Sequence, residues 1–215
     1  MKETAIINYG SGNIFSLTNA LDHVGVPNVL VSTPEDLDSY DQMILPGVGA
    51  FSDCMDKLHE KQFTSAIQTF VEAGKKTLGI CVGMQMLFDK SFEFGESQGF
   101  GFLPGNVEKL PTANAKNMPI TVPHVGWRKI DICEAASGIT GVGQVFAQLD
   151  ASHEYYFVHS FSAKLKIRTD LIATADYTGV SIAAAAGRDH LLGLQFHPEK
   201  SGEAGLELLK RWAEF

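Results

Sequence analysis

Short apolar runs alternate with amphipathic stretches in the first half of the chain. Three of these runs are rich in aliphatic residues, which predicts buried strands at residues 4–8, 28–32 and 42–45. Between the first two, apolar side chains recur at helical spacing, at Ile14, Leu17, Leu21 and Val24. Asn13 can cap this helix and Gly25 can end it. Strand and helix therefore alternate from the beginning of the sequence.

The same alternation continues toward the middle of the chain. Helical segments are expected between about residues 51 and 73. A strand containing Leu78 and Ile80 follows, and after it a helix over residues 84–88. This βαβ order predicts a parallel sheet, in which functional sites lie at the carboxyl ends of the strands.

The pattern changes in the second half. From residue 92 to residue 149 it loosens, and turn formers are frequent. Extended segments are expected at residues 122–128 and 154–160, and short, closely spaced strands at 171–175, 180–186 and 191–196. The close spacing predicts antiparallel pairing. A final helix capped by Ser201 has an apolar face made by Ala204, Leu208, Leu209 and Trp212. We therefore expect one α/β domain over residues 1–215: a mostly parallel central sheet flanked by helices, with an antiparallel portion in the C-terminal half.

The composition narrows the classes of function. Hydrophobic residues make up 45% of the 215 and charged residues 20%, as in soluble globular proteins. The net charge of −8, from 25 acidic and 17 basic residues, argues against nucleic acid or an anionic membrane as the main partner. No apolar run approaches the roughly 20 residues of a membrane helix, and the N-terminus lacks a signal-peptide pattern.

The cysteines point to a reducing compartment. Cys54, Cys81 and Cys133 are few, odd in number and without Cys-x-x-Cys spacing. This pattern suits the cytoplasm and supports neither a zinc site nor a disulfide framework. We expect a cytoplasmic protein without a metal or cofactor.

One stretch carries a candidate nucleophile. Gly79 and Gly83 flank Cys81 between the predicted strand and the predicted helix. This Gly-x-Cys-x-Gly arrangement is the cysteine counterpart of the nucleophile elbow, in which glycines leave room for a substrate carbonyl. Amides at the start of the helix favour a thiolate and offer donors to an oxyanion. The alternative is a core cysteine, since cysteine is among the most buried residue types.

A second stretch carries a candidate base. His197 ends an apolar strand, and Glu199 lies two residues further on, with Pro198 restricting the backbone between them. Side chains two apart in an extended chain project to the same side, so the carboxylate can reach the imidazole. A histidine held in this way can take the proton of a thiol. A strand end with a solvated turn is the alternative.

Two glycine-containing loops follow predicted strands. Gly47 and Gly49 stand after the third strand, where backbone amides could turn toward an oxyanion, although an ordinary turn explains them equally well. The loop at residues 10–12 lacks the third glycine of a dinucleotide site and the lysine of a P-loop. We interpret it as a tight turn, or as a loop that presents Asn13 to a partner.

Three stretches together resemble a known family. They are Gly-Ile-Cys-Val-Gly-Met-Gln at 79–85, Pro-Gly-Val-Gly at 46–49 and Gln-Phe-His-Pro-Glu-Lys-Ser at 195–201. In this combination they resemble the class I, triad-type glutamine amidotransferases. The resemblance covers nearly the whole chain in the right order, without a large insertion. It implies the single-domain fold of that class over residues 1–215.

The resemblance implies hydrolysis of L-glutamine to glutamate and ammonia. Cys81 would attack the side-chain carboxamide and form a glutamyl thioester. His197 would act as base and then as acid, and Glu199 would orient it. The remaining residues implied at the oxyanion and substrate site are Gly47, Val48, Gly49, Val82, Gln85, His159 and Ser160. For His159 and Ser160, a packed or partner-facing role is equally compatible with the sequence.

Three further stretches resemble one branch of the family, the glutaminase subunits of imidazole glycerol phosphate synthase. They lie at residues 8–13, 122–127 and 156–161. This resemblance implies a heterodimer with a (βα)₈-barrel synthase subunit, which uses the ammonia to make imidazole glycerol phosphate and an aminoimidazole carboxamide ribotide in histidine biosynthesis. Tyr9 and Asn13 would face that partner.

Departures from the family pattern are modest. Asn8 stands where aspartate is expected and Val82 where leucine is more usual, but neither removes a group that the chemistry needs. Three competing functions are compatible with parts of the sequence. A paralogue could supply ammonia for amidation of a surface-polysaccharide sugar. A scaffold could keep the fold without activity, and a cysteine hydrolase of the protease or chaperone type could use a related elbow.

Overall fold

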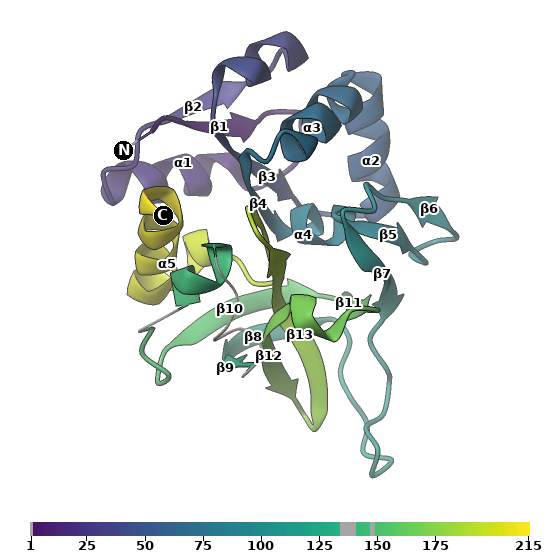
Figure 1. Ribbon diagram of the computed structural model, residues 1–215. Helices are drawn as coiled ribbons and strands as arrows, with labels where there is room; N and C mark the ends of the chain where they lie inside the picture. The colour runs from purple at the N-terminus through teal and green to yellow at the C-terminus, as the bar shows by residue number, and fades with distance from the viewer. Residues whose placement is uncertain (1, 134–140, 147–148) are drawn as a thin grey trace.

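The computed structural model describes residues 2–133, 141–146 and 149–215 (Figure 1). The first half alternates strands and helices as predicted: β1 (Thr4–Ile7), α1 (Ile14–His23), β2 (Asn28–Val31), β3 (Gln42–Gly47), α2 (Phe51–Glu60), α3 (Phe63–Glu72), β4 (Lys76–Cys81) and α4 (Val82–Met86). A 3-10 segment, η1 (Pro34–Ser39), links β2 to β3. The predicted helical region between residues 51 and 73 is two helices, separated at Gln62, whose φ is +60°.

The second half is mostly strands. They are β5 (Phe88–Ser91), β6 (Ser97–Gln98), β7 (Leu103–Lys109), β8 (His124–Lys129), β9 (Asp131–Ile132), β10 (Glu154–His159), β11 (Phe161–Leu165), β12 (Leu171–Tyr177), β13 (Val180–Arg188) and β14 (Leu191–Leu194). Short 3-10 segments are η3 (Gly141–Phe146), η4 (Arg168–Asp170) and η5 (Pro198–Lys200), and α5 (Gly202–Glu214) follows.

In the described part of the chain, the largest sheet has eight strands in the order β2-β1-β3-β4-β14-β13-β12-β9. The pairs from β2 to β14 are parallel, whereas β14, β13, β12 and β9 pair in antiparallel fashion. This confirms the predicted combination of a parallel sheet with an antiparallel addition. β8 and β10 form a separate antiparallel pair, and β11, β7, β5 and β6 form a third sheet.

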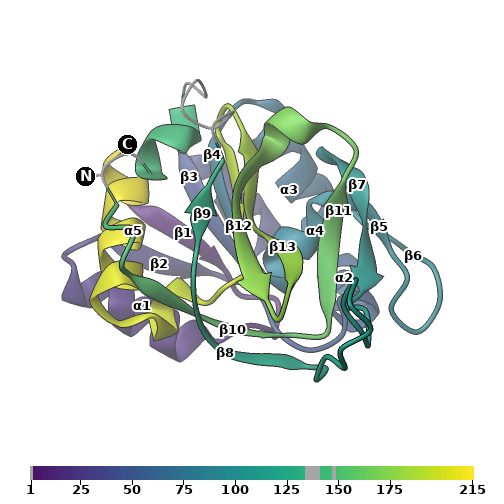
Figure 2. The same ribbon diagram turned by 90° about the horizontal axis from the view of Figure 1, so that it is seen from below.

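Helices cover both faces of the parallel strands. Figures 1 and 2 show α1 and α5 on one side and α2 and α3 on the other. Their inward residues are fully buried, among them Leu17 and Leu21 of α1, Phe63 and Ile67 of α3, and Leu208, Leu209 and Trp212 of α5. No helix among the described residues is long and apolar enough to cross a membrane.

The helix predicted after Cys81 is present but ends earlier than expected. It begins at Val82, directly after Cys81, and ends at Met86, so that Phe88 opens β5 instead. The carbonyls that a longer helix would use are taken by neighbouring backbone: Phe100 donates to Met86 O at 2.8 Å and Leu103 to Leu87 O at 3.0 Å. Pairing with the third sheet therefore ends the helix early.

Candidate active site

Cys81 stands at a sharp turn between β4 and α4. Its backbone has φ of +55° and ψ of −111°, a strained conformation for a residue with a Cβ. β4 lies between β3 and β14, with Gly47 opposite Cys81 in the parallel register. The turn therefore lifts the thiol out at the carboxyl end of the central strands.

Glycines on both sides make this turn sterically feasible. A Cβ on Gly79 would lie 2.7 Å from the carbonyl oxygen of Gly83, and a Cβ on Gly83 would collide with the carbonyl oxygen of Leu45. Because the chain packs on itself so closely here, neither position accepts a side chain without movement of the backbone. This is the crowding that the sequence pattern predicted.

His197 lies between a carboxylate and the thiol. Its Nδ1 is 2.8 Å from Oε1 of Glu199, and the two side chains are only 3% and 2% exposed. On its own, burial would lower the pKa of His197, but hydrogen bonds and charge interactions with Cys81 and Glu199 raise it to about 10. The protonated imidazole of His197 is therefore favoured at neutral pH, and the segment is buried rather than a solvated turn.

The backbone of His197 is fixed by strand β10. The His197 N–H donates to Tyr156 O at 2.9 Å, and the Ser201 hydroxyl donates to His197 O at 2.6 Å. The same hydroxyl oxygen accepts the N–H of Tyr156 at 3.0 Å. Ser201 stands at the N-cap of α5 but makes no capping bond in the described structure, because its side chain joins His197 to β10.

Asn13 takes part in the same cluster. It occupies the N-cap position of α1, but its side chain makes no capping bond there in the described structure. Instead its Nδ2 donates to Oε1 of Glu199 at 3.2 Å. The other carboxylate oxygen of Glu199 is buried and has no partner among the described residues. Asn13, predicted to face a partner, thus lies behind the carboxylate.

The thiol opens on a cavity of about 180 Å³. Of the predicted residues, those that line it with Cys81 and His197 are Val48, Gly49, Val82, Gln85, His159 and Ser160. Gly47 lies beside it, at the end of β3. Glu93 also lines the cavity, and its Oε2 accepts the N–H of Phe51 at 2.8 Å. A cavity of this size suits a small molecule rather than a polypeptide.

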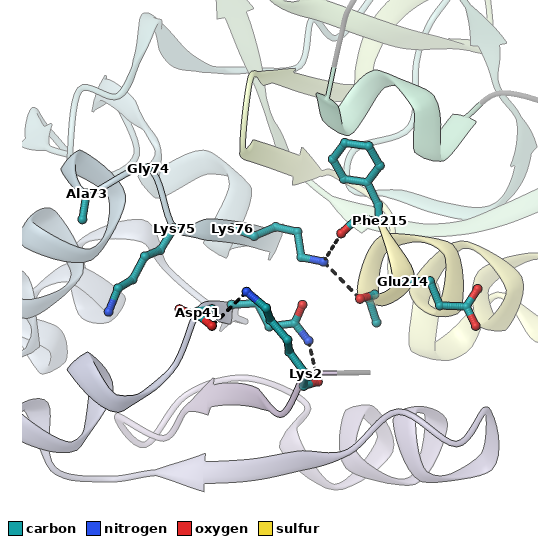
Figure 3. Close-up of a pocket in the computed structure, with 10 residues that line it drawn as sticks. Lys2, Asp41, Ala73, Gly74, Lys75, Lys76, Glu214 and Phe215 are labelled. Atoms are coloured by element: carbon teal, nitrogen blue, oxygen red, sulfur yellow. Dashed lines mark hydrogen bonds and ion pairs between the residues drawn. The ribbon is translucent and has the colours of Figure 1, made fainter.

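A larger cavity of about 960 Å³ lies at the other end of β4 (Figure 3). Its lysines near β4 and the N-terminus already have partners: Lys76 Nζ donates to the carbonyls of Trp212, Ala213 and Phe215, and Lys2 pairs with Asp41 at 2.9 Å. The described residues that line it carry no thiol, hydroxyl or imidazole. The chemistry therefore belongs to the smaller cavity.

The loop after β3 is held from behind. The hydroxyl of Tyr9 donates to Pro46 O at 2.7 Å, and Ser11 Oγ lies 2.9 Å from the carbonyl oxygen and 3.4 Å from the amide nitrogen of Val48. The Val48 N–H therefore points to Ser11 and not into the cavity. Tyr9 is completely buried. This corrects the prediction that Tyr9 faces a partner: packing against the loop leaves it no exposed surface.

Two buried histidines stand beside the cavity. His159 Nδ1 is 2.8 Å from Phe161 O, and His159 Nε2 is 3.0 Å from His124 Nδ1. Burial lowers the pKa of His124 to about 3 and, despite the Phe161 carbonyl, that of His159 to about 4. Both rings are therefore neutral at physiological pH, which fits a packed role for His159 better than proton transfer.

Several residues at the site were not predicted from the sequence. Glu93 lies where the hydrophobic pattern loosens, and no motif marks it. Gln195 and Ser201 lie within the stretch around His197, yet only the fold shows which atoms they contact. Within residues 2–133, 141–146 and 149–215, no cluster of His, Cys, Asp or Glu is arranged to hold a metal ion.

Comparison with known proteins agrees with this geometry. The family described as glutamine amidotransferase class-I matches residues 5–214. The imidazole glycerol phosphate synthase subunit HisH of Bacillus velezensis is 40% identical over 209 residues, covering 97% of this chain and 94% of that protein. Its namesake from Lacticaseibacillus casei is 42% identical with the same coverage.

The fold is also shared with a solved structure. PurLQS from Thermotoga maritima matches with a TM-score of 0.74, covering 100% of this chain and 99% of that chain. The identity is only 18%, so this likeness concerns the fold alone.

Proposed function

The chain belongs to the class-I glutamine amidotransferases, and we propose from this premise that it is the glutaminase subunit of an imidazole glycerol phosphate synthase. The proposal rests on one observation: the buried side chains of Cys81, His197 and Glu199 lie together, and Cys81 and His197 line one small cavity. Relatives at about 40% identity over nearly the full length bear the name of that synthase. These relatives favour the imidazole glycerol phosphate synthase subunit over an amidotransferase for surface-polysaccharide sugars. They also favour it over a scaffold or a protease-type hydrolase.

Hydrolysis begins from the thiolate of Cys81 beside the imidazolium of His197. The sulfur attacks the carboxamide carbon of L-glutamine, and the imidazolium gives its proton to the departing nitrogen, which leaves as ammonia. The neutral imidazole then takes a proton from water as that water attacks the thioester. Glutamate leaves and the thiolate is restored. Glu199 holds the Nδ1–H throughout and stabilises the cationic ring.

Backbone amides would hold the oxyanion. Val82 begins α4, so its N–H has no acceptor within the helix and is available at the cavity. The Val48 N–H faces Ser11, so a second donor from this loop requires the peptide to turn toward Cys81. Gly47 and Gly49 on either side, the latter at φ of +93°, allow that rotation. Turnover would then depend on the state of this loop.

Substrate recognition follows from the charges at the cavity. Both amide hydrogens of Gln85 go to Phe161 O and Gln195 Oε1, so its own oxygen remains to accept from glutamine. Glu93 is the one carboxylate among the described residues that line the cavity, and the α-ammonium group of the substrate needs an anion. Ser160 can donate to the substrate carboxylate. His159 supports Phe161 from behind.

The partner would cover the surface around η5. Phe15 on α1 is 77% exposed and Trp127 on β8 is 44% exposed, and the Trp127 ring packs on Tyr156 of β10. Tyr156 is in turn bonded to the backbone of His197. An exposed aromatic surface this close to the site suits a synthase subunit, here a (βα)₈ barrel, that receives ammonia directly. The complex would be cytoplasmic, with residues 1–215 forming one domain.

Reconstitution tests the proposal. The chain is mixed with a histidine-pathway barrel synthase, and glutamate and imidazole glycerol phosphate are measured together. We expect both products in equal amounts with glutamine as the nitrogen source. Release of glutamate without formation of imidazole glycerol phosphate would refute the assignment to histidine biosynthesis. Absence of both products would refute the glutaminase activity itself.

A further inference from the structure

Two buried glutamines lie directly behind the nucleophile. Gln85 on α4 is 3% exposed and Gln195, which follows β14, is fully buried. Gln195 and His197 both lie in the short segment between β14 and η5. Gln195 Nε2 lies 3.9 Å from Cys81 Sγ, and His197, which lines the same cavity as Cys81, interacts electrostatically with that sulfur. The sulfur is therefore contacted by two side chains from one short segment.

The orientation of both amides is determined by a single backbone carbonyl. Phe161 O can only accept, so the group of Gln85 that lies 3.0 Å from it must be the NH₂. The second hydrogen of that NH₂ points to Gln195 at 3.1 Å, so Gln195 must present its oxygen there. Its own NH₂ then faces Cys81. His159 donates to the same Phe161 carbonyl and so helps to hold that carbonyl in place.

A donor at this place matters because the thiolate is buried. Cys81 is 4% exposed, and a buried anion needs hydrogen-bond donors in place of water. A distance of 3.9 Å is a weak contact with a neutral thiol. Bonds to an anion are shorter and stronger, so the contact strengthens when the sulfur becomes charged. The amide is neutral and does not compete with His197 for the proton.

We propose that Gln195 stabilises the thiolate of Cys81 through a hydrogen bond from its carboxamide, in an orientation imposed by Phe161 O through Gln85. This deepens the proposed glutaminase function and rests on it. A purely structural glutamine in this chain looks different: Gln42 is equally buried, but its Nε2 donates to Lys2 O and Thr4 Oγ1, far from any reacting atom. Gln42 therefore provides a matched control.

The test is alkylation of Cys81 by iodoacetamide as a function of pH, quantified on the Cys81 peptide by mass spectrometry so that Cys54 and Cys133 do not contribute. In Gln195→Met we expect the pH of half-maximal rate to rise by about one unit, the size of one charge-assisted bond. Gln195→Asn, whose amide is one methylene too short to reach the sulfur, moves it in the same direction. Gln42→Met leaves it unchanged.

A second measurement needs no change at Gln195. The side-chain amide protons of Gln195, followed by NMR in the full chain, shift between the parent and Cys81→Ala. An unchanged alkylation profile in the Gln195 variants, or unchanged amide resonances, overturns the proposal. Since alkylation uses no glutamine, a normal pH response in a protein that does not hydrolyse glutamine would refute the glutaminase function alone.

Discussion

At the scale of single residues, the site depends on the backbone of Cys81. A φ of +55° is strained for a residue with a side chain, at a cost on the order of 1–3 kcal/mol. It persists because Gly79 and Gly83 let β4 and α4 pack without a side chain between them. The result is a buried sulfur that lines the cavity beside His197 and the amide of Val82. Each group contributes only in this arrangement.

Replacing the nucleophile separates the two halves of the reaction. In Cys81→Ala, glutamine-dependent synthesis with the partner falls about 10⁴-fold or more, because no thioester forms. Synthesis from added ammonium salts continues, since only the generation of ammonia is lost. Imidazole product is measured with each nitrogen source. Loss of both activities would show that Cys81 is structural.

Glu93→Gln removes the negative charge from the cavity. The amide oxygen can still accept the Phe51 N–H, so the fold is kept, while attraction for the α-ammonium group is lost. We expect KM for glutamine to rise roughly tenfold to a hundredfold with a smaller change in kcat. Glu96→Gln, at an exposed pair with Lys90, is the control. Equal KM values in the two variants would exclude Glu93 from substrate binding.

At the scale of elements, the ends of three neighbouring parallel strands supply the site. β3 ends in the loop with Gly47 and Val48, β4 ends in Cys81, and β14 leads into Gln195 and His197. The β8–β10 pair closes the cavity from the other side through His159 and holds His197 in place. The order β3-β4-β14, which pairs β4 with the last strand of the chain, brings these residues together.

Lys76 secures the opposite end of β4. Its ammonium donates to three carbonyls at the end of α5, at 2.7 to 3.1 Å. Lys76→Met leaves these carbonyls without their charged donor, and we expect the free energy of unfolding to fall by about 1–3 kcal/mol in urea titrations. Lys75→Met, which loses a pair with the exposed Asp38, should change it by less than about 1 kcal/mol. An equal loss of unfolding free energy in the two variants would contradict the stabilising role of Lys76.

The histidine pair between β8 and β10 makes stability depend on pH. Burial lowers the pKa of His124 to about 3 and that of His159 to about 4, below the unfolded value near 6.5. Between about pH 6.5 and 4 the unfolded chain therefore binds up to two more protons than the folded chain. The free energy of unfolding then falls with acidification, by up to about 2.7 kcal/mol per pH unit from this pair.

His124→Phe checks this dependence. The new ring can stack on Tyr177 and Phe157 as the imidazole does, and one of the two titrating groups is gone. Between pH 4 and 6.5, the free energy of unfolding should change less steeply with pH than in the parent, by the contribution of about one proton. This difference does not depend on the overall stability of the variant. Parallel slopes in parent and variant would rule out the pair as the source.

At the scale of the whole molecule, the exposed aromatic residues Phe15 and Trp127 lie on elements that are connected through direct contacts to His197 and Glu199, the proposed base and its carboxylate. Trp127 packs on Tyr156, the backbone of Tyr156 bonds to His197 and Ser201, and Asn13 at the start of α1 bonds to Glu199. A subunit seated over η5, as proposed, would press on elements that hold His197 and Glu199. The loop with Val48 lies at the same end of the sheet.

The isolated chain should therefore be a poor glutaminase. The Val48 amide faces Ser11, which leaves the oxyanion with fewer donors, and loss of one donor costs about 10²–10³-fold in kcat. We expect glutamate release to rise by roughly that factor when the synthase subunit and its ligand are added. Equal turnover with and without the partner would contradict this coupling.

Local patterns were sufficient for much of the architecture. The strands and helices of the first half, the antiparallel strands near the end and the residue types Cys81, His197 and Glu199 follow from periodicity and spacing. The helix after Cys81 ends earlier than predicted because the carbonyls of Met86 and Leu87 accept hydrogen bonds from the backbone of Phe100 and Leu103. Asn13 and Ser201 are residue types that often cap helices, but their side chains bond instead to Glu199 and to the His197 carbonyl.

The amino-acid order by itself determined the strands and helices of the first half, and it identified the groups that can act as nucleophile, base and carboxylate, because these properties depend on neighbours in sequence. It did not reveal β5, β6, β7 or β11. Only the tertiary structure decided that Tyr9 is buried, that Glu93 lines the cavity, and that Gln195 reaches the sulfur. These facts depend on which strands are adjacent in space. A polar side chain bonds to whatever the fold places within about 3 Å, and no local pattern specifies that neighbour.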